Sequence, residues 1–280
     1  MDRQSVCKRG DHPWTASITW TRGRGRPALF VHGVGTGSHL WRDVIAELRG
    51  ERRCIAIDLP LHGGSDPRDD LSLPALAEAV EELCEHLGLT GIDLVGNDTG
   101  GAVCQIFAVR HRERLRTLTL TNCDVHTNTP PEPFKPTVEL AAKGELAALT
   151  EVLLDHPELL AQTALGEGYE RIHDPKAVVD AYIRPILSKP GGGRAFERLL
   201  AGIDAKDMIA IEPQLTVLTV PTLLVWGTGD PFFDVSWARW LRDTIPGVRE
   251  IVEIEGGRLF FPEERAAELV PHLRRFWAHT

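Results

Sequence analysis

The stretch Leu94-Val95-Gly96-Asn97-Asp98-Thr99-Gly100-Gly101 decides the fold of this chain. An apolar strand runs into a glycine-rich turn, and a helical pattern begins near Gly100. Glycines on both sides of Asp98 predict a strained backbone that passes close to a neighbouring segment. The turn would hold Asp98 above the strand end at a helix N-terminus, which favours a carboxylate. A plain helix cap is the simpler alternative, because aspartate also caps helices.

Short apolar runs alternate with helical patterns on both sides of this turn. The predicted strands cover residues 28–31, 54–59, 92–95, 115–121, 221–226 and 250–254. Such strands, separated by amphipathic helices, predict the α/β class with a mostly parallel central sheet flanked by helices.

The alternation stops in the middle of the chain, where the pattern becomes helical. We therefore predict a core made of residues 1–125 and 216–280, and an inserted helical cap made of residues 126–215. Inserts of this kind lie over the carboxyl ends of the strands, where open α/β sheets bind ligands.

Composition limits the classes of partner. The chain has 280 residues, 42% of them hydrophobic, and a formal net charge of -9, which argues against nucleic acid or an anionic membrane as a partner. The sequence contains no transmembrane-length apolar segment, no signal peptide and no C-x-x-C pair among five cysteines, so we expect a cytoplasmic protein. We expect a small organic molecule as its partner, without metal or cofactor. The oligomeric state, including a homodimer, stays open.

Several motifs then resemble the α/β-hydrolase superfamily, in the family's order. They are His32-Gly33, the run from Asp58 to Ser65, the turn at Asp98, and Val225-Trp226-Gly227-Thr228-Gly229-Asp230. The resemblance covers nearly the whole chain except the insert. An aspartate in the turn is similar to the haloalkane dehalogenase and epoxide hydrolase branches, in which the aspartate attacks carbon and water hydrolyses the resulting ester.

This resemblance implies roles for individual residues. Asp98 matches the nucleophile, Asp230 the acid of the catalytic triad, and Asp124 the alternative acid position. The loop that begins at His32 would border the substrate, and the backbone N–H groups of Val34 and Thr99 would form an oxyanion hole.

The chain departs from the family at the catalytic histidine. Arg258 occupies that place, and arginine stays protonated, so it cannot serve as a general base. In one interpretation His126, close to Asp124, supplies the base, with His39 and His62 as weaker candidates. In the other, Arg258 pairs with Asp230 or Asp98, or clamps an anionic substrate group.

Other departures affect the choice of branch. Val34 and Thr99 occupy the places where haloalkane dehalogenases hold the halide, which weakens that assignment. Epoxide hydrolases use cap tyrosines, and both tyrosines of this chain, Tyr169 and Tyr182, fall in the insert. We therefore predict hydrolysis of an epoxide or a related compound through an aspartyl ester. The alternatives are a lyase, isomerase or cyclase that uses Asp98 as acid and base, and an inactive ligand-binding protein.

Overall fold

The computed structural model describes residues 17–280. Within this range the sheet has seven strands in the order β1-β3-β2-β4-β5-β6-β7. All neighbouring strands are parallel except β1, which pairs antiparallel with β3. The strands are β1 (Ser17–Arg22), β2 (Pro27–Val31), β3 (Arg53–Asp58), β4 (Ile92–Asp98), β5 (Leu115–Cys123), β6 (Thr222–Gly227) and β7 (Val248–Ile254). The predicted α/β class with a mostly parallel sheet is confirmed, whereas β1 was not predicted.

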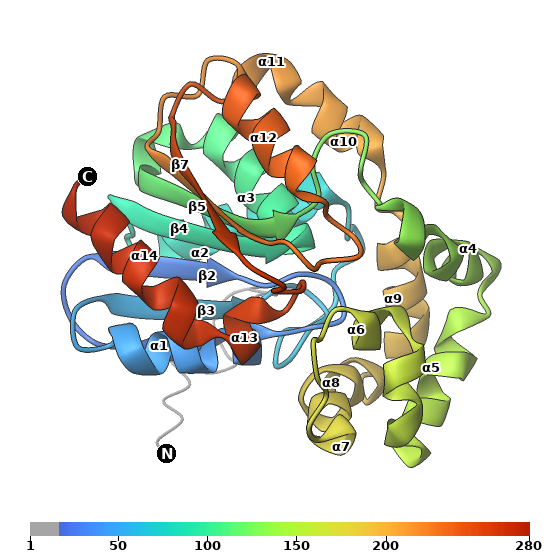
Figure 1. Ribbon diagram of the computed structural model, residues 1–280. Coiled ribbons are helices and arrows are strands. Elements are labelled where there is room, and N and C mark those ends of the chain that lie inside the picture. The colour runs from blue at the N-terminus through green and yellow to red at the C-terminus, as the bar shows by residue number, and fades with distance from the viewer. Residues whose placement is uncertain (1–16) are drawn as a thin grey trace.

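Helices cover both faces of the sheet. Figure 1 shows α1, α13 and α14 on one face, and α2, α3 and α12 on the other. Their bounds are α1 (Arg42–Leu48), α2 (Leu73–His86), α3 (Thr99–Arg110), α12 (Val235–Thr244), α13 (Phe261–Glu264) and α14 (Ala266–Ala278). Because both faces are covered, every residue of β4 is buried, including the polar Asp93, Asn97 and Asp98, which therefore need partners inside the protein.

The segment between β5 and β6 is helical, as expected. Figure 1 shows α4 to α9 grouped at one end of the sheet, while α10 and α11 lead back along the core. The helices are α4 (Lys135–Lys143), α5 (Leu146–Asp155), α6 (Ala164–Glu167), α7 (Pro175–Val178), α8 (Arg184–Leu187), α9 (Gly192–Ala201), α10 (Ala205–Ala210) and α11 (Glu212–Leu215). Shorter helical turns are η1 (Ser38–Trp41), η2 (Arg112–Arg114), η3 (Glu132–Phe134), η4 (Pro157–Gln162) and the π-helical η5 (Val179–Ile183).

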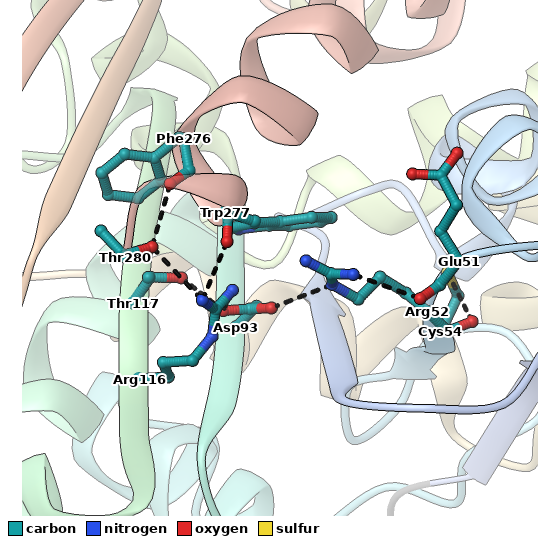
Figure 2. A network of polar contacts seen from close by, with 9 residues as sticks. All are labelled: Glu51, Arg52, Cys54, Asp93, Arg116, Thr117, Phe276, Trp277 and Thr280. Carbon is teal, nitrogen blue, oxygen red and sulfur yellow. Dashed lines mark hydrogen bonds and ion pairs between the residues drawn. The ribbon is translucent and has the colours of Figure 1, made fainter.

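A buried charge cluster holds the opposite end of the sheet together (Figure 2). Asp93, near the start of β4, has no exposed side-chain surface and forms ion pairs with Arg116 at 2.6 Å and Arg52 at 3.4 Å. Arg116 also donates to the carbonyl of Trp277 in α14, and the Arg52 guanidinium lies over the Trp277 ring. A buried carboxylate requires such partners, because an unpaired buried charge is strongly destabilising. The cluster thus joins β4 and β5 to the last helix.

Two further features of the structure are the state of its cysteines and the character of its helices. Cys54, Cys84, Cys104 and Cys123 are buried and free, and Cys7 lies outside the described residues. Among residues 17–280, no helix combines the length and the apolar character that crossing a bilayer requires.

Candidate active site

Asp98 lies at the strained turn that the sequence predicted. Its backbone has φ 56° and ψ -136°, at the junction of β4 and α3. A capping residue adopts an extended backbone, so the plain helix cap does not account for this conformation. A Cβ at Gly100 would lie 2.3 Å from the carbonyl oxygen of His32, which explains why glycine follows the turn.

The Asp98 carboxyl group is buried and faces two peptide N–H donors. The backbone N–H groups of Val34 and Thr99 hydrogen-bond to it and lower its pKa. Burial, followed by the nearby Asp124 carboxyl, acts in the opposite direction and raises the pKa well above its ordinary value. A Cβ at Gly33 would lie 2.1 Å from Asp98 Oδ2, so only glycine lets the loop come this close. The structure therefore brings Asp98, Val34 and Thr99 together as expected.

Two neutral histidines hold the loop that carries Val34. His32 Nε2 accepts from the N–H of Leu59 at 3.0 Å, and His32 Nδ1 lies 2.7 Å from the Gly33 carbonyl, which places the proton on Nδ1. His62 Nε2 accepts from the N–H of Gly35 at 3.2 Å, and burial lowers the pKa of His62 to about 3. Both rings are fully buried. His32 and His62 thus support the loop from behind and do not border the cavity.

A cavity of about 320 Å³ opens above Asp98, between the core and the cap. Its floor includes Val34, Asp98, Thr99 and Asp124. Its walls are mainly apolar and come from the cap and the β6–α12 loop, including Phe134, Leu140, Leu153, Phe196, Leu200 and Phe232. Asp98 and Asp124 are the ionisable residues among those that line it. Such a space suits an apolar organic molecule that presents one polar group to the floor.

Asp124 lies beside Asp98 because their strands are neighbours. Asp98 pairs in register with Cys123 at the end of β5, so the next residue reaches the same edge of the sheet. The Thr99 hydroxyl donates to Asp124 Oδ2 at 3.0 Å, and Gln105 Nε2 donates to the Asp124 backbone carbonyl at 2.9 Å. Burial raises the pKa of Asp124 to about 7, against the opposing effect of hydroxyls from Thr99 and Thr129. Asp124 therefore changes protonation near neutral pH.

Asp230 and Arg258 lie near the site but outside the cavity lining. Asn122 Nδ2 donates to Asp230 Oδ2 at 2.7 Å, and the N–H of Phe232 donates to Asp230 Oδ1 at 2.9 Å. Burial raises the pKa of Asp230 to about 7, and the Arg258 charge acts in the opposite direction. Arg258 Nη1 donates to the carbonyls of Glu167 and Tyr169, both at 3.2 Å. The Arg258 side chain, which stands where the family has its catalytic histidine, therefore contacts the cap, and its guanidinium is not part of the cavity floor.

The structure does not bring His126 to the cavity. Its Nε2 lies 3.2 Å from Glu212 Oε2, and its ring stacks on Trp240 with centroids 4.8 Å apart. Across the described part of the chain, the residues that line the cavity include no histidine. Neither His126 nor His39 or His62 is therefore placed to activate a water molecule beside Asp98.

Tyr169 and Tyr182 are also absent from the lining, contrary to their expected role. Their hydroxyls donate to Glu263 Oε2 at 3.2 and 2.6 Å, and Arg42 pairs with Glu263 Oε1 at 2.8 Å. These four residues form a latch between the cap and α13. Glu263 was not among the predicted site residues, although it follows Pro262 shortly after the predicted histidine position. Its place close to the apolar Phe260-Phe261 pair could have indicated a buried carboxylate, and a buried carboxylate requires hydrogen-bond or ion-pair partners.

Comparisons with known proteins agree with this geometry. A sequence profile described as alpha/beta hydrolase fold matches residues 27–265. Haloalkane dehalogenase 2 of Mycobacterium tuberculosis (strain ATCC 25618 / H37Rv) is 30% identical over 223 residues, covering 75% of this chain and 73% of that protein. The cis-3-alkyl-4-alkyloxetan-2-one decarboxylase of Xanthomonas campestris pv. campestris is 25% identical over 276 residues, covering 90% of this chain and 88% of that protein.

A solved structure shows the same fold. The epoxide hydrolase CorEH superposes with a TM-score of 0.75 at 22% identity, over 94% of each chain. The profile match spans most of the sequence, and the turn places Asp98 where the fold carries its nucleophile. The chain is thus an enzyme of the α/β-hydrolase-fold family, in the branch with aspartate at the nucleophile position.

Proposed function

We propose that this enzyme hydrolyses an apolar epoxide, or a related strained electrophile, through an ester on Asp98. One observation carries the proposal: a buried carboxylate faces two peptide N–H donors at the floor of an apolar cavity. The N–H groups of Val34 and Thr99 would hold one carboxylate oxygen while the other attacks carbon. Once the ester forms, the same donors would stabilise the negative charge that develops on its carbonyl oxygen when water attacks.

The walls of the cavity indicate the kind of substrate. Apolar side chains, chiefly phenylalanine and leucine, line most of it, so the part of the molecule away from the reacting carbon should be hydrocarbon. An alkyl halide would release an anion beside Asp124. Within the described residues, no arginine, lysine, histidine, tryptophan or asparagine lines the cavity to stabilise that anion. A leaving oxygen that takes up a proton avoids this repulsion, which favours the epoxide class.

Isotope labelling tests the ester directly. The enzyme would be incubated with 1,2-epoxyoctane or styrene oxide in heavy-oxygen water over many turnovers, and the peptide that contains Asp98 analysed by mass spectrometry. We expect label in the Asp98 carboxyl group, because water attacks the ester carbonyl. Asp98→Ala should lose turnover. Turnover without label in this peptide would refute the covalent route.

A second candidate function is acid–base chemistry without hydrolysis, as in a lyase, isomerase or cyclase. It is favoured by the absence of histidine from the described cavity lining and by the raised pKa of Asp98. A relative named as a decarboxylase is 25% identical to this chain over 276 residues. The same labelling experiment separates the two functions, since acid–base chemistry converts the substrate without placing heavy oxygen in Asp98.

A further inference from the structure

We infer that Asp124 is the general acid and then the general base of the reaction, taking the place of the missing histidine. This inference rests on the proposed function, because it concerns the proton transfers that ester formation and hydrolysis require. It starts from the cavity lining, where Asp124 is the ionisable partner of Asp98.

The hydrogen bonds around Asp124 leave one oxygen free for this role. Thr99 fixes Oδ2 and Gln105 fixes the backbone carbonyl, so the orientation of the carboxyl group is set by residues of α3. Oδ1 is buried and forms no hydrogen bond, and the hydroxyl of Thr129, the other threonine near this carboxyl group, is likewise buried without a hydrogen-bond partner. An unpaired buried carboxyl oxygen is costly unless it carries a proton or meets a ligand. Both conditions arise in the proposed reaction.

The neighbouring charges distribute the protons in the resting enzyme. Burial and the Asp124 carboxyl raise the pKa of Asp98, but Asp98 also accepts two peptide N–H groups at the start of α3, and these donors favour its ionised form once Asp124 is uncharged. Two buried carboxylates side by side repel each other, so the pair keeps one proton, and we assign it to Asp124 because the two peptide N–H donors are directed at Asp98. The resting site therefore holds a nucleophile, Asp98, and an acid, Asp124, beside the same substrate.

In the first step, an oxygen of Asp98 bonds to the epoxide carbon and the carbon–oxygen bond of the ring breaks. The released oxygen leaves on the side of the carbon opposite Asp98, so the Asp124 proton reaches it through a water molecule in the cavity, and the products are a hydroxyalkyl ester on Asp98 and an ionised Asp124. No free alkoxide forms, and the site keeps one negative charge throughout. Because Asp124 supplies this proton, the reaction needs no additional proton donor, such as a tyrosine of the cap.

In the second step, Asp124 takes a proton from water as the water oxygen bonds to the ester carbonyl carbon. The resulting oxyanion is held by Val34 and Thr99. When the intermediate collapses, the carbonyl of Asp98 forms again, the bond between its carbon and the alkoxy oxygen breaks, and the new carboxylic acid proton of Asp98 passes to the departing alkoxide. The diol leaves, Asp98 is again ionised and Asp124 is again protonated, so one epoxide and one water are consumed.

The test compares Asp124→Asn with wild type, using 1,2-epoxyoctane as the probe and intact-protein and peptide mass spectrometry as the readout. Asparagine keeps the shape of the side chain but cannot accept a proton from water. We expect turnover to fall by at least about 100-fold, the contribution of general acid–base catalysis. Ester formation also loses its acid, but ring strain still drives it, so over a long incubation with excess epoxide the alkyl ester on Asp98 should accumulate, because its hydrolysis lacks the base that activates water.

A matched control uses Asp207→Asn, which changes a partly buried carboxyl group of α10 outside the cavity lining. It should turn over like wild type without accumulating ester. Two results would refute the role of Asp124 while leaving the Asp98 ester in place. In the first, Asp124→Asn hydrolyses the epoxide at the wild-type rate. In the second, Asp124→Asn accumulates no ester whereas Asp230→Asn does. If no protein forms an ester or takes heavy oxygen into Asp98, the proposed function itself fails. Circular dichroism of each variant verifies that it is folded.

Discussion

Replacing Asp124 by asparagine should change how the stability of the protein depends on pH. In the folded protein the pKa of Asp124 is about 7, raised chiefly by burial, against an ordinary value of 3.8. Between these values the unfolded chain releases this proton while the folded protein keeps it, so the wild type loses stability as pH rises from about 4 to 7. The cost is absent below about pH 4 and complete above about pH 7.

The size of this effect follows from the two pKa values. At about 1.4 kcal/mol for each pH unit, ionising Asp124 in the folded protein costs roughly 4 kcal/mol. Asp124→Asn removes that cost and also frees Asp98 from a charged neighbour. We therefore expect the stability of Asp124→Asn relative to wild type to improve by about 2–4 kcal/mol between pH 4 and pH 8.

Urea unfolding at several pH values measures this difference. Burial lowers the pKa values of His32 and His62, which destabilises the folded protein in acid, so the whole wild-type curve combines opposite trends. The difference between the two proteins removes the histidine contributions and leaves that of the Asp98–Asp124 pair. An exposed carboxylate, Asp69→Asn, serves as the control for a change in net charge. A difference that stays constant within about 0.5 kcal/mol from pH 4 to pH 8 would show that Asp124 is not held protonated.

Three further predictions concern other parts of the molecule. Asp93→Ala should lower the free energy of unfolding by about 3–5 kcal/mol, because Arg52 and Arg116 lose their buried partner, and a loss below 1 kcal/mol in urea unfolding would contradict the role of this cluster. Gly33→Ala should reduce kcat by at least about 100-fold, because the added Cβ overlaps Asp98 and displaces the Val34 donor; a rate equal to that of wild type would be incompatible with the described contact. Glu263→Ala should increase hydrogen exchange in α6 to α8, since it leaves the hydroxyls of Tyr169 and Tyr182 without their acceptor, and unchanged exchange would show that other contacts hold the cap.

The backbone of the site was predictable from local sequence. Glycines around Asp98 and after His32 set the turn and the close approach, and these in turn place the N–H groups of Val34 and Thr99. The strand pattern likewise gave the parallel part of the sheet. β1 was not predicted because Ser17–Arg22 alternates polar and apolar residues, as an antiparallel edge strand does, whereas the buried parallel strands contain longer apolar runs.

The partners of long side chains were not predictable in this way. His126 follows the expected strand, yet it turns towards Glu212, which lies 86 positions later in the sequence. Tyr169 and Tyr182 fall in the cap as expected but converge on Glu263 of the core. Local patterns fix which face of an element is buried, but the direction of a polar side chain depends on the packing of distant segments. Asp124 is a further example, because the pairing of β4 with β5 brings its carboxyl group beside Asp98.

The peptide donors at Asp98 have a consequence for ionic strength. Val34 and Thr99 contribute neutral dipoles, and the histidines that hold the loop are buried and uncharged. Dissolved salt screens charges at the surface far more than groups in a dry interior. The stabilisation of the Asp98 carboxylate, and of the oxyanion formed from its ester, should therefore hardly change from dilute buffer to concentrated salt.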